Sequence, residues 1–202
     1  MTLWLAPQPL LLASQSAVRR TLLTSAGVAV DVQPADIDER AVEARAGLSG
    51  AGDVAGLLAR EKAQAVAAEH PSRIVLGADQ TLTLNARRFS KAKDRAGARE
   101  QLSMLRGRTH TLHSAVAVWR GSERLFEHVD AAHLTMRHFS DDFLERYLDA
   151  AGAAAMSSVG GYQLEGLGVQ LFEKVEGDHS TVLGLPLLPL LRWLRAEGLW
   201  AP

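Results

Sequence analysis

The sequence contains no cysteine and few aromatic residues, and each shortage excludes a class of protein. Without cysteine among its 202 residues, the chain has no disulfide, no thiol nucleophile and no zinc site built on thiolates. Aromatic residues make up 5% of the chain, and no dense basic stripe accompanies them, which disfavours a nucleic-acid-binding module. The absence of disulfides is compatible with a reducing compartment, and we expect a cytoplasmic protein.

Net charge and hydrophobic runs exclude two further partners. The chain has 22 basic and 23 acidic residues, so no global field gathers nucleic acid or anionic lipid. The apolar stretch at residues 183–191 is far shorter than the roughly 20 residues that cross a bilayer. The apolar N-terminus lacks a basic start and is interrupted by Pro7 and Pro9, which argues against a signal peptide. We expect no membrane partner and no nucleic-acid partner.

Strand and helix patterns alternate along the chain, which predicts a mixed α/β protein. We expect strands at residues 10–13, 28–32, 74–79, 109–119, 125–138 and 168–173, and a hairpin over residues 81–90 with its turn near Asn85. We expect helices between the N-cap Ser16 and Gly27, at 54–70 behind an Asp53 cap, at 94–106, at 140–150, and between Pro186 and Gly198. The residues between Asp36 and Asp53 are expected to form an acidic segment and a loop.

Polar residues gather where the first strand meets the first helix. Ser14 follows the strand, and Arg19 and Arg20 fall in the first turn of the helix that Ser16 caps. Free N–H groups and the helix dipole favour anions at this end, so cations there are unfavourable unless an anion binds. The pattern indicates either an anion-binding site or two solvated arginines.

A lysine lies on the apolar stripe of the second expected helix. Leu58, Lys62 and Val66 are spaced at i, i+4 and i+8, so they share the stripe that faces the core. Lys62 must therefore either find an anion there or extend its side chain to water.

A carboxylate follows a run of buried apolar residues. Asp79 comes directly after residues 74–78, at the expected end of a strand, where open α/β sheets place their ligand clefts. A hairpin with its turn near Asn85 would bring Lys91 roughly opposite Asp79. The two charges would line one opening, either as part of a binding site or as a structural ion pair.

A glycine-rich segment at residues 160–168 is the fourth unusual place. Glycines at this density permit positive φ angles and a close approach of the backbone to another group. On spacing alone a flexible loop is favoured, because the sequence has neither a GxxxxGK[ST] nor a GxGxxG motif. The HExxH zinc motif and the GxSxG nucleophile motif are absent as well.

Taken in order, these places resemble one family, the Maf family of nucleoside triphosphate pyrophosphatases. The resemblance covers nearly the whole chain after about residue 10 and is carried by short segments in the right order and spacing. They are residues 13–20, 38–39, 62, 77–80, 90–92, 107–110, 161–168 and 184–186. Each segment alone is weak, whereas the ordered set is specific.

The resemblance implies a fold, an activity and partners. The implied fold is α/β, similar to that of inosine triphosphatases: an elongated mixed β-sheet with flanking helices and two lobes around a deep cleft. Residues 1–202 would form a single Maf-like domain. The implied activity is hydrolysis of a nucleoside triphosphate between its α and β phosphates, which releases the monophosphate and pyrophosphate. A divalent metal cation (Mg, Mn or Co) and a homodimer are implied as well.

The same resemblance assigns roles to individual residues. Asp79 matches the proton acceptor that activates the attacking water. Lys62 and Lys91, which are assigned to catalysis with it, match phosphate-handling positions, as do Ser14 and Arg19. Glu39, together with Asp79, is assigned to metal binding. The positions assigned to substrate binding are Ser14, Val18, Arg19, Arg20, Gln80 and Glu165. This set makes physical sense, because a triphosphate carries about four negative charges and its hydrolysis depends mainly on positioning and charge stabilisation.

Two positions bear on which base is bound. The family divides into two branches, one preferring pyrimidines and one preferring 7-methylguanine. This chain resembles the second branch, because it has Gln80 and Glu165 at the positions that differ. A carboxylate can accept two hydrogen bonds from the N1–H and amine of a guanine edge, which uracil cannot supply. Val18 matches neither branch, since the methylguanine branch has tryptophan there and the pyrimidine branch arginine. Ala92 replaces the proline that usually follows the site lysine.

Other functions stay open at this point. One is a nucleotide-binding regulatory protein, related to cell division, without significant turnover. Another is a pyrophosphatase specific for dTTP and UTP. The presence of Asp79 together with Lys62 and Lys91 favours an enzyme, because binding alone would tolerate loss of the base.

Overall fold

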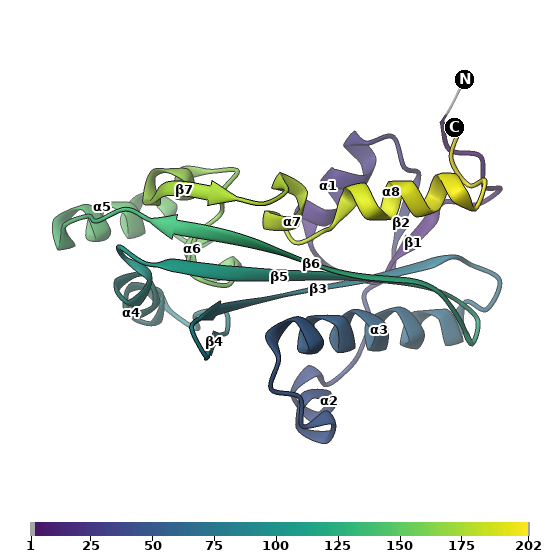
Figure 1. Ribbon diagram of the computed structural model, residues 1–202, viewed down its shortest axis with the longest axis horizontal. Coiled ribbons are helices and arrows are strands. Elements are labelled where there is room, and N and C mark those ends of the chain that lie inside the picture. Colours follow the sequence, from purple (N-terminus) through teal and green to yellow (C-terminus); the bar gives the residue numbers. More distant parts are fainter. Residues whose placement is uncertain (1–2, 202) are drawn as a thin grey trace. The chain divides into compact units, whose positions relative to one another are not determined.

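The chain forms a mixed α/β structure with helices flanking a seven-stranded sheet, as the sequence predicts. The computed structural model describes residues 3–201, and the sheet has the order β2-β1-β3-β5-β6-β7, with β4 paired to β3 (Figure 1). The chain divides into two compact units. The first contains the residues up to Gln80, His113–Asp130 and those from His179 on; the second contains Thr81–Leu112 and Ala131–Asp178.

The elements have the following bounds. The three long strands contribute residues to both units and are β3 (Val75–Leu84), β5 (Thr109–Arg120) and β6 (Glu123–Met136). The first unit adds β1 (Leu10–Leu12), α1 (Ala17–Ser25), β2 (Val30–Val32), α2 (Glu39–Ala46), α3 (Ala51–Glu69), α7 (His179–Val182) and α8 (Leu187–Ala196). The second unit adds β4 (Arg87–Phe89), α4 (Arg95–Leu105), α5 (Asp141–Ala151), α6 (Ala154–Ser157), the 3₁₀-helix η1 (Leu167–Leu171) and β7 (Phe172–Glu176).

Side-chain alternation along β1 and β3 builds a core on each face of the sheet in the first unit. Leu10, Leu12 and Leu76 point to one face and pack in the cluster that includes residues of α1 and α8. Leu11 and Val75, which pair in the parallel register of β1 and β3, point to the other face and pack against α3. Figure 1 shows α1 and α8 on one side of the sheet and α3 on the other. This alternation decides which helix each polar residue of β3 meets.

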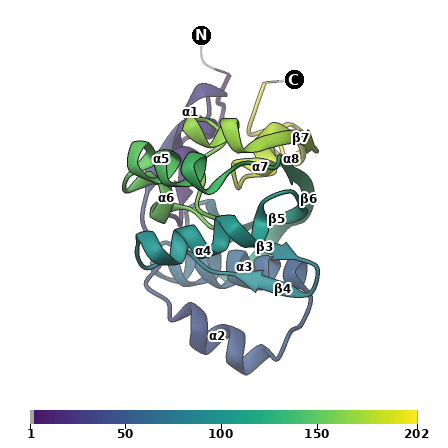
Figure 2. The same ribbon diagram turned by 90° about the vertical axis from the view of Figure 1, so that its left-hand side faces the viewer.

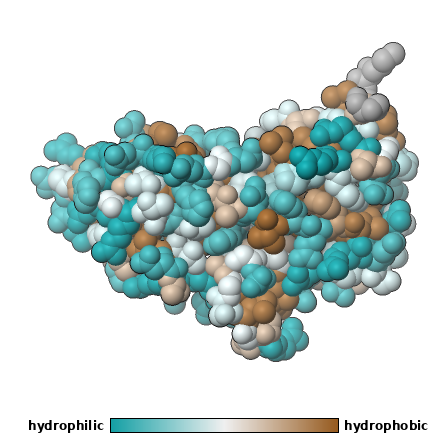
Figure 3. Space-filling model, in the orientation of Figure 1, coloured by the Kyte–Doolittle hydropathy of each residue, from teal (hydrophilic) through white to brown (hydrophobic). Residues whose placement is uncertain are grey.

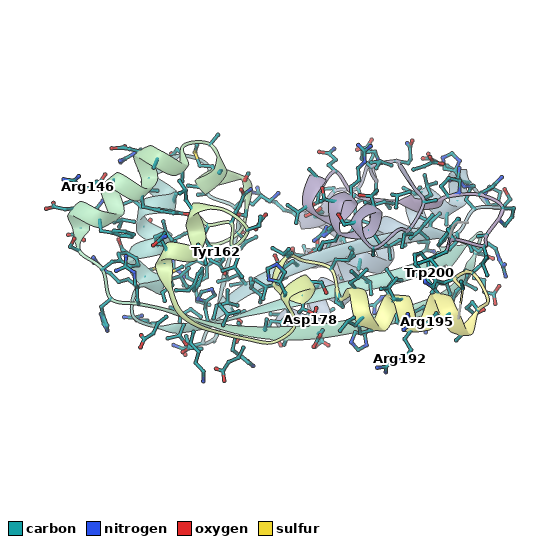
Figure 4. The ribbon with its side chains drawn as sticks, turned by 90° about the horizontal axis from the view of Figure 1, so that it is seen from above. Arg146, Tyr162, Asp178, Arg192, Arg195 and Trp200 are labelled. Carbon is teal, nitrogen blue, oxygen red and sulfur yellow. The ribbon has the colours of Figure 1, made fainter. Side chains whose placement is uncertain are left out.

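The last helix is anchored to the start of the chain. Arg192 and Arg195 are exposed on α8, whereas Trp200 is buried (Figure 4). Trp200 forms an isolated antiparallel bridge with Trp4, and the two indole rings meet edge to face with centroids 6.4 Å apart. This contact ties the residues that follow α8 to the segment that precedes β1.

Helices and aromatic residues hold the second unit together. Helices α4 and α5 are linked by ion pairs of Arg99 with Glu145 and of Arg95 with Asp149. Figure 2 shows these two helices on the side of the second unit that faces the viewer. Tyr162 is buried, and its hydroxyl lies 2.6 Å from Nε2 of His110 on β5. Figure 4 shows Tyr162 among the side chains inside this unit.

Two sequence expectations about helices in the first unit are wrong. Asp53 does not cap α3: the helix begins at Ala51 behind Gly50, and Asp53 lies in its first turn, where a carboxylate still favours the helix dipole. The stretch expected as an acidic segment and loop contains α2. Asp38 caps this helix by accepting a hydrogen bond from the Ala41 N–H, and Gly47 ends it with φ of +61°.

The strand expected at residues 168–173 begins later. Residues Leu167–Leu171 form η1, and β7 starts at Phe172 and pairs antiparallel with β6. A Cβ on Gly168 would lie 2.4 Å from the Gln163 carbonyl oxygen, so the chain is too tightly folded here for an extended strand.

The surface is polar with separate apolar patches. Figure 3 shows apolar residues, in brown, between hydrophilic ones, for example around the protrusion formed by α2. Within residues 3–201 no helix combines the length and the apolar character needed to cross a bilayer.

Candidate active site

Three charged side chains from three elements meet in the first unit. Nζ of Lys62 on α3 lies 2.6 Å from Oδ1 of Asp79 on β3 and 2.7 Å from Oε1 of Glu39 at the start of α2. The side chains of Lys62 and Asp79 are 13% and 11% exposed, whereas that of Glu39 is 50% exposed. Lys62 therefore lies on the core-facing stripe, as predicted, and meets carboxylates there instead of extending to water.

Asp79 lies inside a strand and not at its end. Strand β3 continues to Leu84, so the expected end of the strand at Asp79 is wrong. The parallel neighbour β1 stops at Leu12, which pairs with Leu76. Asp79 lies three residues beyond this last pair, where β1 no longer covers the edge of β3.

Close packing of β3 against α3 brings Asp79 to Lys62. A Cβ on Gly77 would lie 2.0 Å from the Ala59 carbonyl oxygen and 2.7 Å from the Ala63 nitrogen. Such distances are impossible for a real side chain, so only glycine lets the strand and the helix backbone approach this closely. Gly77 thus sets the separation across which the Lys62–Asp79 ion pair forms.

Burial and nearby opposite charges have opposing effects on the pKa values of the site residues. Burial raises the pKa of the Asp79 carboxyl above its ordinary value, and the positive charges of Lys62 and Arg19 lower it by a smaller amount. Burial also lowers the pKa of Arg19, offset in part by the charges of Asp79 and Glu39. A carboxylate whose pKa is raised in this way holds a proton more readily than an exposed aspartate does.

Arg19 is held by three oxygens of the first unit. Its Nε donates to the Gly184 carbonyl oxygen at 2.9 Å, and its Nη1 donates to the Ala78 carbonyl oxygen at 2.8 Å and to Oγ of Ser14 at 3.1 Å. The guanidinium is planar, so these contacts also fix the direction of Nη2. Nη2 has no hydrogen-bond partner among residues 3–201, which leaves its two N–H groups available to an anion.

Ser14 also has unused hydrogen-bonding capacity. Its Oγ accepts from Nη1 of Arg19 and, at 3.3 Å, from the backbone N–H of Ser16. A hydroxyl that accepts twice still carries its own O–H donor. Ser16 caps α1 by accepting from the Arg19 N–H, as the sequence predicts. The start of α1 therefore presents donors to an anion, in agreement with the interpretation of this junction as an anion site.

The other two residues assigned to this junction lie differently. Arg20 is exposed, and its side chain has no hydrogen bond or ion pair within the described part of the chain. Arg20 matches the alternative of a solvated arginine, whereas Arg19 does not. Val18 is partly exposed on the first turn of α1.

Gln80 faces the opposite side of β3 from Asp79. Its Nε2 lies 2.9 Å from Oγ of Ser114, 3.0 Å from the Val182 carbonyl oxygen and 3.2 Å from the Thr181 carbonyl oxygen. Sequence patterns gave no role to Ser114 or Thr181, because a single serine on a strand and a threonine in a four-residue helix carry no recognisable signal. The motif at residues 184–186 was the nearest pointer to this region.

Lys91 lies in the second unit and is not paired with Asp79 across the hairpin. The hairpin turns at Asn85, with φ of +54°, but β4 ends at Phe89. The Ser90 carbonyl accepts a hydrogen bond from Gln101 on α4 at 2.8 Å, and Lys91 forms an isolated bridge with Val159. The hairpin has the expected register, with Leu82 opposite Phe89, but the ladder ends there and does not reach Lys91. Lys91 is exposed in an open depression that Arg87, Arg88 and Lys93 also line.

The glycine-rich segment of the second unit is an ordered turn. Gly160 and Gly161 have φ of +86° and +80°, and the Gly161 carbonyl accepts a hydrogen bond from the Tyr147 hydroxyl at 3.1 Å. Glycine is required here for backbone geometry, so the interpretation as a plain flexible loop is not needed. Glu165 is exposed at the far side of this turn.

The carboxylates can be tested for their fit to a divalent cation. No group of three or more histidine, aspartate or glutamate side chains suited to a metal occurs within residues 3–201. Asp79 and Glu39 do converge on one point, the Nζ of Lys62, and each has a second oxygen without a hydrogen bond to the described residues. Mg²⁺ is commonly held by one or two carboxylates together with phosphate oxygens and water. The donor set fits a cation that arrives with a triphosphate, not an all-protein cage.

Comparison with known proteins places this geometry in a family. Residues 9–197 match the family model described as Maf-like protein. The chain belongs to the Maf-like protein family. The match spans every residue of the first-unit cluster and both candidate residues of the second unit, so the resemblance seen in the sequence is confirmed.

Curated relatives match 94% to 100% of the chain. A protein of Rhodopseudomonas palustris named nucleoside triphosphate pyrophosphatase is 57% identical over 201 residues, 100% of both chains. One of Bradyrhizobium diazoefficiens with the same name is 55% identical over 201 residues, again 100% of both. A Rhizobium etli protein named 7-methyl-GTP pyrophosphatase is 52% identical over 191 residues, 94% of this chain and 96% of that one.

A solved structure gives a weaker match. A HAM1 protein from Coxiella burnetii has a TM-score of 0.39 and 15% identity, and covers 63% of this chain and 72% of that chain. These values are too low to add to the family assignment.

Proposed function

We propose that this Maf-like protein is a nucleoside triphosphate pyrophosphatase, a hydrolase that cleaves between the α and β phosphates and yields a nucleoside monophosphate and pyrophosphate. The observation that carries the proposal is the buried Asp79 carboxylate, held 2.6 Å from Lys62. The names of full-length relatives at 52% to 57% identity support the same activity.

Asp79 is proposed as the base that takes a proton from the attacking water. Lys62 binds Oδ1 and thereby fixes the plane of the carboxylate, while Oδ2 stays free of the described residues to accept the proton. The raised pKa brings the carboxyl closer to neutral pH, which makes it a better proton acceptor than an exposed aspartate.

Lys62, Arg19 and Ser14 are proposed to bind phosphate oxygens. An ammonium has three donors, and Lys62 uses two of them for Asp79 and Glu39, so one remains. Arg19 adds the two donors of Nη2 and Ser14 adds one hydroxyl. Donors fixed in advance by the protein stabilise the charge of the transition state most effectively, because they need no reorganisation.

A divalent cation (Mg, Mn or Co) is proposed to bind between Asp79, Glu39 and the substrate. When bound, such a cation neutralises phosphate charge and makes the phosphorus easier to attack. Glu39 is half exposed, so it can turn toward an incoming metal–triphosphate complex at little cost.

Roles for the remaining assigned residues rest on the family resemblance. Lys91 is proposed to bind phosphate oxygens, and Glu165 is proposed to accept hydrogen bonds from a guanine edge, which favours 7-methyl-GTP over UTP or dTTP. Arg20 and Val18 are proposed to contact substrate from the first turn of α1. The resemblance assigns Gln80 to the same choice of base.

We also propose a homodimer in the cytoplasm. The dimer rests on the family resemblance, and size-exclusion chromatography with light scattering tests it. The location rests on the absence of cysteine, and cell fractionation tests it.

The test of the proposed activity is a substrate panel. Purified protein with Mg²⁺ is incubated with 7-methyl-GTP, GTP, UTP and dTTP, and released pyrophosphate is measured. We expect release from at least one, with 7-methyl-GTP preferred. Release from none would support the alternative of a regulatory nucleotide-binding protein, and preference for UTP or dTTP would refute the role given to Glu165.

A further inference from the structure

The amide nitrogen of Gln80 is engaged within the protein, although the carboxylate of its neighbour Asp79 keeps a free oxygen. The two residues are adjacent on β3, so their side chains point to opposite faces of the sheet. Nε2 of Gln80 contacts Oγ of Ser114 and the carbonyl oxygens of Thr181 and Val182 at 2.9 to 3.2 Å. Both of its N–H donors are therefore used inside the first unit.

The orientation of the amide follows from its partners. Carbonyl oxygens only accept hydrogen bonds, so the group that faces Thr181 and Val182 has to be the NH₂ and not the oxygen. A base bound near Gln80 would meet an amide that has no N–H left to donate.

Ser114 and Gln80 act on the same carbonyl. Ser114 is fully buried, accepts from Gln80 and donates to the Thr181 carbonyl oxygen at 2.7 Å. That oxygen also accepts from the Gly184 N–H at 3.0 Å, which closes the turn between α7 and α8. A second bond joins the Thr181 hydroxyl to Asp130 on β6 at 3.0 Å. The turn is thus fixed to β3, β5 and β6.

The same turn holds Arg19. Its last glycine, Gly184, has φ of +90° and accepts from Nε of Arg19 at 2.9 Å. A Cβ on Gly184 would lie 3.4 Å from both Nε and Nη2 of Arg19 and 3.6 Å from Cδ of Gln80. Gly184 is therefore packed between the two side chains, and a shift of the turn moves its carbonyl relative to the guanidinium.

We propose that Gln80 and Ser114 are positioning residues for Arg19. They fix the Thr181–Gly184 turn, the Gly184 carbonyl fixes Nε, and the planar guanidinium then directs Nη2 toward the phosphates. The inference deepens the proposed function and rests on it, because it names how this site recognises the triphosphate part of any substrate.

The first arm of the test uses a ligand without a base. Binding of inorganic tripolyphosphate with Mg²⁺ is measured by calorimetry for the wild type, Gln80→Met and Ser114→Ala. Each variant removes hydrogen bonds worth about a tenfold change in affinity at most, so we expect binding weakened roughly three- to tenfold. The matched controls are Gln64→Met on the exposed side of α3 and Ser103→Ala, whose buried hydroxyl has no partner among the described residues. Both controls should bind like the wild type.

The second arm separates positioning from a general loss of structure. Because Gln80 acts through Arg19, Gln80→Met should have almost no further effect on binding in an Arg19→Gln background. If the two substitutions weaken tripolyphosphate binding by factors that simply multiply in the double variant, the proposal is overturned. If Gln80→Met does not fold, Ser114→Ala in the same cycle gives the same decision.

The third arm compares substrates. Positioning of Arg19 predicts that kcat/KM for 7-methyl-GTP, GTP and UTP falls by the same factor in Gln80→Met. Unchanged tripolyphosphate binding together with an altered ratio among these substrates would show that Gln80 reads the base. A wild type that binds tripolyphosphate but hydrolyses nothing would refute the proposed function and leave the binding cycle as the test of Gln80.

Discussion

The two faces of β3 around residues 79 and 80 differ in charge and in completeness. On the α3 face, Asp79 lies among charged groups that retain free donors and acceptors. On the opposite face, Gln80 belongs to a neutral network in which its donors and the Ser114 hydroxyl are all engaged. Of two adjacent residues on one strand, Asp79 thus faces groups that can still bind a ligand, whereas Gln80 faces groups that are already hydrogen-bonded to each other.

The difference shows how a catalytic group can be recognised. Buried polar groups in a protein that serve structure alone are usually satisfied by hydrogen bonds. The neutral network meets this rule, whereas Asp79 is a carboxylate whose pKa burial raises, and Arg19 keeps one nitrogen without a hydrogen bond to residues 3–201. Incomplete pairing of a buried charge, more than burial itself, marks the site.

The largest effect is expected where the charged face loses its base. Asp79→Asn keeps the size of the side chain and removes the proton acceptor, so kcat for pyrophosphate release should fall by about 10²- to 10⁴-fold. Tripolyphosphate binding should change much less. A variant that keeps more than a tenth of wild-type kcat would place the base elsewhere.

Loss of Lys62 tests the electrostatics of the same face. Lys62 lowers the pKa of Asp79 against the larger raising effect of burial, so Lys62→Met should raise this pKa further. Because only the ionised carboxylate accepts a proton, the acid limb of the pH–rate profile should move to higher pH, and kcat at neutral pH should fall by about 10²-fold. Lys62→Arg keeps the charge and should move the limb less; an unmoved limb in Lys62→Met would contradict the ion pair.

The packing that joins strand and helix can be broken at Gly77. A methyl group there overlaps Ala59 and Ala63, so Gly77→Ala should lower the free energy of unfolding by about 1–3 kcal/mol or more and reduce activity by separating Lys62 from Asp79. Urea denaturation measures the first effect. Gly52→Ala in the same helix meets only ordinary contacts at 3.5 Å and should change stability by at most about 1 kcal/mol.

The smallest effect on activity is expected from a neutral buried pair in the second unit. Burial lowers the pKa of His110 to about 4, below the ordinary value of about 6.5. Above pH 6.5 the imidazole is neutral in both the folded and the unfolded state. As the pH falls from 6.5 toward 4, only the unfolded state binds the proton, so the free energy of unfolding falls by about 3 kcal/mol over that range. His110→Phe should flatten this part of the stability–pH curve in urea denaturation, whereas kcat of the folded protein near pH 7 should stay within a few-fold of the wild type.

Much of this arrangement follows from the sequence because local rules dominate it. Apolar alternation placed β5 and β6, and the spacing of Leu58, Lys62 and Val66 placed Lys62 on the core-facing stripe of its helix. Ser16 and Gly27 bounded α1 through capping and a positive φ. The ordered motifs of the Maf-like family were sufficient to assign the family.

The features that the sequence did not predict depend on contacts between residues far apart in the chain. The ladder expected to bring Lys91 opposite Asp79 ends at Phe89, and the Ser90 carbonyl accepts a hydrogen bond from Gln101 on α4 instead. The short helices α2, α6 and α7 have too few residues for a periodic pattern. The network of Gln80, Ser114 and Thr181 joins positions up to 101 residues apart, and no local pattern reports such a contact.

The most direct test of the central claim is the identity of the products formed in ¹⁸O-labelled water. With Mg²⁺ and 7-methyl-GTP, the wild type is predicted to yield the monophosphate and pyrophosphate, with one ¹⁸O incorporated for each bond cleaved, and Asp79→Asn is predicted to yield neither at a comparable rate. Formation of a diphosphate and inorganic phosphate, or equal rates in the two proteins, would contradict hydrolysis between the α and β phosphates by water that Asp79 activates.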